Sequence, residues 1–187
     1  METQTKRFVI EFARKVIENF VKNESVLEIP KKYPKELESK RGVFVTIFKN
    51  ENLRGCIGYP YPTQSAIKNL REAAVGVTRD PRFPPLRKNE LDEIVVEVSV
   101  LTEPKLIEVK KKEKYLERIE PHKDGLIIKK DMRSGLFLPQ VWEQIPDKIE
   151  FLSNLCLKAG LSPDEWMSDG ISIYKFQVEF VKEDELD

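Results

Sequence analysis

A cysteine between two glycines, two positions after an arginine, is the feature of this chain best suited to chemistry. It lies in the stretch Leu53-Arg54-Gly55-Cys56-Ile57-Gly58, after the apolar run Gly42–Phe48. Glycine weakens a strand unless the backbone bends or another group approaches it closely. The stretch therefore marks either a tight packing point or a site.

The period of two in an extended segment predicts that Arg54 and Cys56 share one face. A guanidinium near a thiol favours the thiolate, and Gly55 and Gly58 would leave open space around the sulfur. One interpretation is a reactive or ligand-contacting Cys56. The other is a small buried apolar residue, which is the usual place of a free cysteine.

A second candidate is the loop sequence Asp80-Pro81-Arg82-Phe83. An acid and an arginine on a rigid loop can clamp a polar ligand, and arginine suits carboxylate or phosphate. Arg54, Arg82 and Arg133 could line one cationic cleft, with Asp80 as the orienting partner. The alternative is a structural pair of Asp80 and Arg82 that pins the loop.

Other chemistries have weaker support. His122 is the only histidine and could act as a base for a nucleophilic Cys56, but the sequence 121–125 is typical of a turn with a solvated histidine. We expect no metal site and no cofactor, because metal-ligand spacings, iron–sulfur cysteines and glycine-rich phosphate loops do not occur. The basic runs 110–112 and 129–130 are interleaved with acids, which favours a solvated face over a nucleic-acid site.

Length and composition indicate one compact unit without a strong charge preference. The chain has 187 residues, enough to bury a real core, and its 40% hydrophobic content argues against disorder. Lys plus Arg and Asp plus Glu number 32 each, so no net charge attracts nucleic acid or an anionic membrane. Abundant Lys and Glu with few cysteines are compatible with a thermophile. Two distant cysteines and no membrane-spanning run predict reduced thiols in a cytoplasmic protein.

The elements expected to position these residues alternate along the chain. Apolar residues at helical spacing predict a helix over 5–22, and a second helix runs from a cap at Thr63 to Thr78. Strands are expected over 43–49, 94–101, 125–129 and 171–181, and the prolines in 80–85 exclude regular structure there. Further helices are predicted over 110–119 and from 146 or 147 to a C-cap at Gly160, and the segment 162–165 is expected to start a short helix. The residues 183–187 read as an acidic frayed end.

The motifs, taken together and in order, resemble the AMMECR family. The resemblance covers nearly the whole chain and rests on these segments: 42–47, 53–58, 73–74, 80–85, 90–91, 97–101, 124–126, 135–141, 158–161 and Trp166. The chain departs from that pattern in two places. Asp124-Gly125-Leu126 stands where many relatives have His-Gly-Leu, and the segment after Val141 is idiosyncratic.

The resemblance implies more about fold than about chemistry. It implies an α+β protein with a β-sheet flanked by helices, as a single domain over 1–187 whose larger and smaller subdomains pack intimately and share a cleft. It implies an association with Memo-like proteins and radical S-adenosylmethionine enzymes in a modification pathway. The chain is then expected to bind a small polar or anionic ligand, as an enzyme or accessory factor, through Arg54, Gly55, Cys56, Gly58, Asp80 and Arg82. The competing hypothesis is a non-enzymatic interaction module for protein or nucleic-acid partners.

Overall fold

The computed structural model describes residues 1–186 and divides the chain into two units. The first unit comprises Met1–Leu101 together with the C-terminal segment from Glu179, and the second comprises Thr102–Val178. Each unit has its own hydrophobic core and its own four-stranded sheet. Helices and antiparallel strands occur in both, so the predicted α+β class is confirmed.

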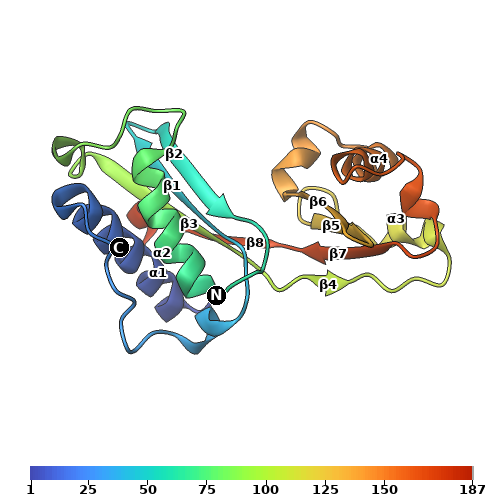
Figure 1. Cartoon of the computed structure of the whole chain (residues 1–187), viewed down its shortest axis with the longest axis horizontal. Coiled ribbons are helices and arrows are strands. Elements are labelled where there is room, and N and C mark those ends of the chain that lie inside the picture. Colours follow the sequence, from blue (N-terminus) through green and yellow to red (C-terminus); the bar gives the residue numbers. More distant parts are fainter. Residues whose placement is uncertain (187) are drawn as a thin grey trace. The chain divides into compact units, whose positions relative to one another are not determined.

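In the first unit two helices cover one face of a sheet (Figure 1). The sheet order is β2-β1-β3-β8. Its elements are α1 (Thr3–Asn23), β1 (Val43–Lys49), β2 (Asn52–Tyr59), α2 (Ala66–Gly76), β3 (Ile94–Leu101) and β8 (Val178–Lys182). Strand β1 is antiparallel to both β2 and β3. Strand β2 is therefore an edge strand, which leaves its outer backbone groups to find partners outside the sheet.

Helix α1 forms because its apolar residues recur at helical spacing and can bury one continuous face. Val9, Phe12, Val16 and Ile17 are all buried in the first core. The helix ends at Glu24, whose left-handed backbone (φ 54°) lets its N–H donate to the carbonyl of Phe20 at 2.9 Å. The helix predicted over 5–22 is thus confirmed.

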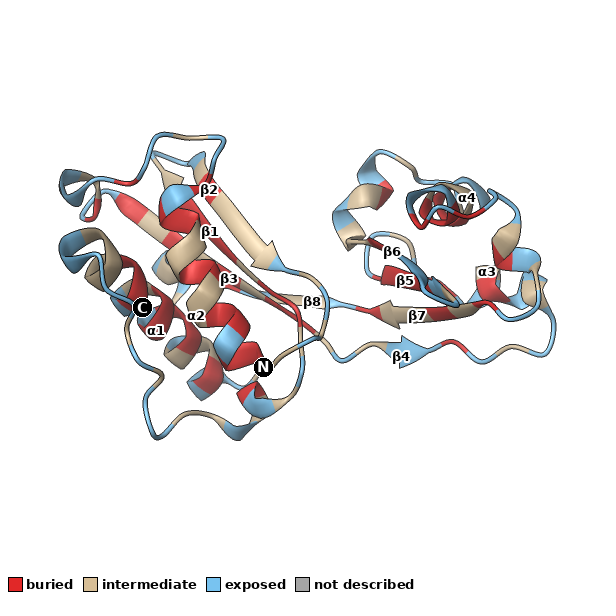
Figure 2. Ribbon diagram, viewed as in Figure 1, coloured by how far each residue is buried: buried red, intermediate tan, exposed pale blue. Residues whose placement is uncertain are grey.

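The strands of the first sheet alternate between a face that packs on the helices and a second face. Val43, Val45 and Ile47 of β1 are buried against the helices, as Val96 and Val98 of β3 are. Figure 2 shows this burial along the strands and along the facing sides of α1 and α2. The second face carries the even-numbered residues of β1, and this face holds the thiol described below.

The second unit contains the sheet β4-β7-β5-β6 and two α-helices. Its elements are β4 (Lys105–Leu106), α3 (Tyr115–Arg118), β5 (Gly125–Lys130), β6 (Arg133–Phe137), α4 (Lys148–Lys158) and β7 (Ser172–Phe176). Asp147 caps α4 by accepting hydrogen bonds from the N–H groups of Ile149 and Glu150, both at 2.9 Å. Trp142 and Phe151 stack in the core with ring centroids 3.6 Å apart.

Several local features differ from the sequence expectations. Helix α2 begins after Ser65 and not after Thr63. The strand β6 was not predicted, and the single strand expected over 171–181 is divided at Gln177 into β7 and β8, which belong to different sheets.

The C-terminal segment is anchored where a frayed end was expected. Glu183 forms an ion pair with Arg14 and accepts a hydrogen bond from the N–H of Val96 at 3.1 Å. Leu186 packs on the first core. The last residue of that predicted end, Asp187, lies outside the described residues.

Candidate functional site

The loop that follows α2 is folded by Asp80. The N–H of Phe83 donates to the Asp80 carbonyl at 3.0 Å, which closes a turn with Pro81 in its second position. The Asp80 carboxylate also accepts the N–H of Arg82 at 3.0 Å. Asp at the first and Pro at the second position are what such a turn favours. The segment 80–85 has no helix or strand, as predicted, and its residues 80–83 form this turn.

Asp80 reaches from this turn to the outer edge of β2. Its Oδ2 accepts the N–H of Cys56 at 2.8 Å, and its two oxygens accept Nε and Nη2 of Arg82 at 3.0 and 2.7 Å. The side chain is only 1% exposed. The hydrogen bonds from Arg82, with help from the Cys56 N–H, hold the pKa of this buried carboxyl well below its usual range.

Arg82 joins the loop to the other outward backbone group of Cys56, its carbonyl oxygen. Its Nη2 donates to the Cys56 carbonyl at 2.9 Å, so both outward backbone groups of Cys56 are satisfied. The bond to Asp80, with a smaller contribution from the Cys56 side chain, raises the pKa of Arg82. The Arg82 side chain is 56% exposed. A guanidinium is thus held beside the thiol with much of its surface open to solvent.

The Cys56 side chain lies on the second face of the sheet and is only partly buried. Its sulfur accepts a hydrogen bond from Oγ1 of Thr46 at 3.2 Å, across the pair of β2 and β1. Because the N–H and C=O of Cys56 point away from β1, Thr46 and Cys56 form a non-hydrogen-bonded pair, in which side chains are closest. The hydroxyl of Thr46 is therefore in direct contact with the sulfur.

The two glycines beside the cysteine permit close packing and do not leave open space. A Cβ on Gly55 would lie 3.0 Å from the Val77 carbonyl oxygen, and one on Gly58 would lie 2.2 Å from the Phe44 ring. Gly55 brings β2 close enough to the end of α2 for Asp80 to reach the Cys56 N–H. The sequence prediction placed open space beside Gly55 and Gly58, but protein atoms occupy the space beside both glycines.

Arg54 is held by Glu90 and not by the thiol. Its Nε and Nη2 donate to the two Glu90 oxygens at 2.9 and 3.0 Å. This bidentate contact is the main reason why the pKa of Glu90 falls to about 2. The pairing shifts register between Ile47 and Phe48, where Arg54 is the extra residue of a bulge. The strict period of two that the sequence prediction assumed is interrupted there.

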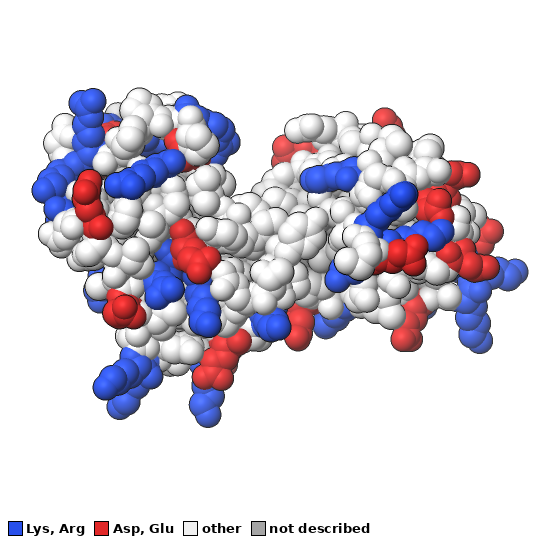
Figure 3. Space-filling model, in the orientation of Figure 1, with Lys and Arg blue, Asp and Glu red and all other residues white. Residues whose placement is uncertain are grey.

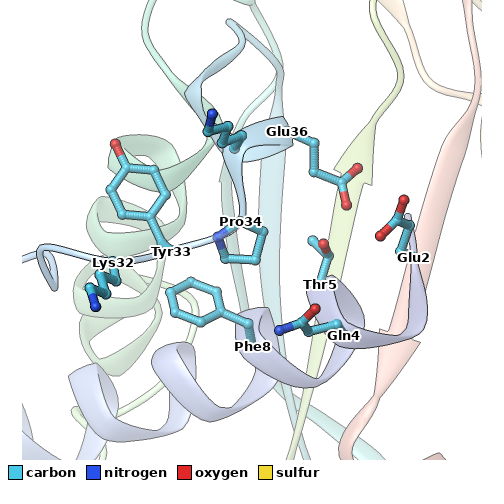
Figure 4. A pocket seen from close by; sticks show the side chains of 9 residues that line it. Glu2, Gln4, Thr5, Phe8, Lys32, Tyr33, Pro34 and Glu36 are labelled. Carbon is cyan, nitrogen blue, oxygen red and sulfur yellow. The ribbon is translucent and has the colours of Figure 1, made fainter.

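Arg54 and Glu90 line a hollow of about 360 Å³ in the first unit. The other lining residues are Lys49, Phe83, Pro84, Pro85, Arg87 and Asn89. A second hollow, of about 600 Å³, lies at the start of α1 (Figure 4). It is lined by aromatic and mixed-charge residues, including Phe8, Tyr33, Lys32 and Glu36, and contains no thiol.

The remaining sequence candidates lie in the second unit. His122 is exposed in the turn before β5, with φ 65°. Arg133 donates to the Gly160 carbonyl at 2.8 Å. Lys130 forms an ion pair with Glu165, and Figure 3 shows acidic and basic side chains mixed on the visible face. Across residues 1–186 no group of three His, Cys, Asp or Glu side chains could hold a metal ion.

Sequence reasoning missed the partners that organise the site. Thr46 lies across β1 from the cysteine, and alternation in both strands could have placed it on the cysteine's face once their pairing was known. The contact between Glu90 and Arg54 could not be predicted, because no pattern in the local sequence links the two residues. No helix within the described residues is long and apolar enough to cross a bilayer.

Comparison with known proteins gives a consistent result. The AMMECR1 family model matches residues 10–181. Protein MJ0810 of Methanocaldococcus jannaschii is 45% identical, covering 94% of this chain and 89% of that protein. Protein MK0488 of Methanopyrus kandleri is 47% identical, covering 95% and 88%. Both sources are thermophilic archaea, in keeping with the composition.

A solved structure extends the match to the fold. The crystal structure of the uncharacterized protein PH0010 from Pyrococcus horikoshii has a TM-score of 0.76 and 42% sequence identity, covering 98% of this chain and 93% of that one. The match to the family model and these relatives agree over almost all of the sequence. The chain therefore belongs to the AMMECR1 family.

Proposed function

We propose that the first unit binds a small polar or anionic ligand beside Cys56, with Arg82 as the cation and Asp80 as the residue that orients it. The observation that carries this proposal is the contrast in exposure between the two members of the pair. Asp80 is 1% exposed, whereas Arg82 is 56% exposed. A purely structural pair has no need to keep its guanidinium open to solvent next to a partly exposed thiol.

The geometry favours an anion over other ligands. Two of the three guanidinium nitrogens of Arg82 are engaged by Asp80 and by the Cys56 carbonyl, and within residues 1–186 no acceptor is found for Nη1. Arginine fixed in this way loses little conformational entropy on binding, and its remaining N–H groups suit a carboxylate or phosphate oxygen. Thr46 adds a hydroxyl on the same face.

In this proposal Cys56 contacts the ligand. A stronger version of the proposal has Cys56 act as a nucleophile toward the ligand. A thiolate in this position would have Thr46 and Arg82 as stabilising neighbours. Arg54, Gly55 and Gly58 support the site by shaping β2 around the cysteine. Participation in a modification pathway with Memo-like and radical S-adenosylmethionine proteins, as enzyme or accessory factor, is supported only by the family's association with them.

A titration followed by nuclear magnetic resonance tests the binding site. Phosphate, sulfate and acetate are added to the ¹⁵N-labelled protein, and the Cys56 amide and the Arg82 Nε–H resonances are followed. We expect saturable shifts at both, and we expect Arg82→Gln to abolish the shift at Cys56. Arg7→Gln removes an exposed arginine on α1 and serves as the matched control. Shifts that are equal in wild type and in Arg82→Gln would contradict the proposal.

A further inference from the structure

Three side chains form one row across the second face of the first sheet. In the strand register, Thr46 of β1 is opposite Cys56 of β2 on one side and opposite Glu97 of β3 on the other. Directly opposite residues in antiparallel strands point to the same face. Thiol, hydroxyl and carboxyl therefore follow one another, and Arg82 lies beyond the thiol at the sheet edge.

Glu97 is unusual among the carboxyl groups of the first unit. It is half-buried, and no donor among residues 1–186 makes a hydrogen bond or ion pair with its carboxyl group. Asp80, Glu90 and Glu183, by contrast, are each bound by an arginine. The Glu97 oxygens are not among the buried side-chain atoms that lack a partner, so solvent reaches them, and an ammonium group from outside the chain can reach them too.

The charged groups around Glu97 do not supply a donor. Burial is the main cause that raises its pKa, Asp184 and Glu185 act in the same direction, and Lys182 opposes them. The Lys182 ammonium, however, is 3.3 Å from Asp184 and lies over the Phe48 ring at 5.5 Å. Lys182, the cation that lowers the pKa of Glu97, is thus already engaged by other partners.

We propose that the ligand of the Cys56 site is an extended zwitterion, with its anionic group at Arg82 and an ammonium group at Glu97. This inference rests on the proposed function, because it uses the same Arg82 site. Neighbouring strands are about 4.8 Å apart, so the row from the sheet edge to β3 spans roughly 10–15 Å. An extended chain of three or four amino-acid residues has about that length. The ligand class is therefore a short peptide or another zwitterion of similar length.

Protection of Cys56 from iodoacetamide tests this inference with three matched probes. Tetraglycine carries both charges, N-acetyl-tetraglycine lacks the ammonium, and tetraglycine amide lacks the carboxylate. In the wild type we expect tetraglycine to protect at concentrations about five-fold or more below those of N-acetyl-tetraglycine, because charge-assisted hydrogen bonds are the strong ones. The amide should protect least. A series from diglycine to hexaglycine should show its best protection at three or four residues.

Variants at Glu97 separate this inference from the proposed function. Glu97→Gln should remove the advantage of tetraglycine over its N-acetyl form and leave protection by the latter unchanged. Glu97→Asp should retain part of the advantage, and Glu11→Gln, at an exposed site on α1, should retain all of it. Urea midpoints establish that each variant is folded. Equal protection by tetraglycine and its N-acetyl form in the wild type overturns the inference but leaves the anion site standing. If neither anionic peptide protects Cys56 while phosphate does, only the inference is overturned, and if phosphate also fails to protect, both are overturned.

Discussion

At the residue scale, the cation beside the thiol comes from the loop after α2 and not from the neighbouring strand position. Alternation predicted that Arg54 would accompany Cys56, but the bulge in β2 interrupts the alternation and Glu90 binds the Arg54 guanidinium. Arg82, 26 residues from the cysteine, takes that place. The sequence identified Asp80 and Arg82 as a pair, but their contact with Cys56 depends on tertiary packing that local patterns do not encode.

Asp80→Asn should destabilise the protein by about 1–3 kcal/mol, because the Cys56 N–H and Arg82 lose a charged acceptor. The pKa of Asp80 is lowered from 3.8 in the folded state. The ionised Asp80 carboxylate therefore stabilises the folded protein above about pH 4, and this stabilisation is lost as the pH falls below that value. Urea unfolding should show a gap between wild type and variant at pH 7 that narrows at pH 3. Asp92→Asn, at an exposed position, is the control. A gap that does not change with pH would count against the charged hydrogen bonds.

Glu90→Gln should cost about 1–3 kcal/mol through loss of the bidentate contact with Arg54. Folding lowers the pKa of Glu90 from 4.5 to about 2, so its stabilising effect is complete well above pH 4.5 and declines as the pH falls toward 2. Glu93→Gln, which removes a 54% exposed partner of Lys49, should cost less than about 1 kcal/mol. Equal urea midpoints for the two variants would show that the Arg54 contact is no stronger than a surface pair.

At the element scale, periodic segments were predictable and short or divided ones were not. Helix α1 and strands β1 and β3 follow their hydrophobic patterns closely. Strand β6 has only five residues with a glycine in the middle, and its pairing with β5 defines it. The interruption at Gln177 is also invisible in the pattern, because residues on both sides alternate equally well.

Gly58→Ala tests the packing of β2 on β1. Its new methyl group would lie 2.2 Å from the Phe44 ring and 2.7 Å from the Val43 carbonyl oxygen. We expect a loss of about 1–3 kcal/mol in the free energy of unfolding. Phe44→Leu in the same background should recover part of that loss, which a double-mutant cycle measures. A Gly58→Ala protein as stable as wild type would remove the steric reason for this glycine.

At the scale of the whole molecule, the two units have separate cores and the candidate site draws its residues from one of them. Thr46, Cys56, Asp80, Arg82 and Glu97 all belong to the first unit. The family resemblance implied one domain with a larger and a smaller subdomain, and the sequence could not place the boundary between them. That boundary is set by contacts between segments far apart in the chain, since the residues from Glu179 onward return to the first unit.

Leu152→Ala should destabilise the second core without affecting ligand binding. Leu152 is fully buried there, and truncation of such a residue costs about 2–5 kcal/mol. Under conditions where the variant remains folded, its phosphate titration at Cys56 should match the wild type. Leu70→Ala makes the corresponding change in the first core and provides the comparison. Loss of binding in folded Leu152→Ala would show that the site requires the second unit.

The most direct test of a ligand-lined thiol is the alkylation rate of Cys56 in the folded protein. Cys156 is fully buried, so Cys56→Ser should abolish labelling under native conditions. We predict that Cys56 reacts while the protein is folded and that phosphate slows the reaction several-fold in wild type but not in Arg82→Gln. A Cys56 that reacts only when the protein unfolds, or whose reaction ignores phosphate and Arg82 alike, would contradict the account and make this stretch a packing motif.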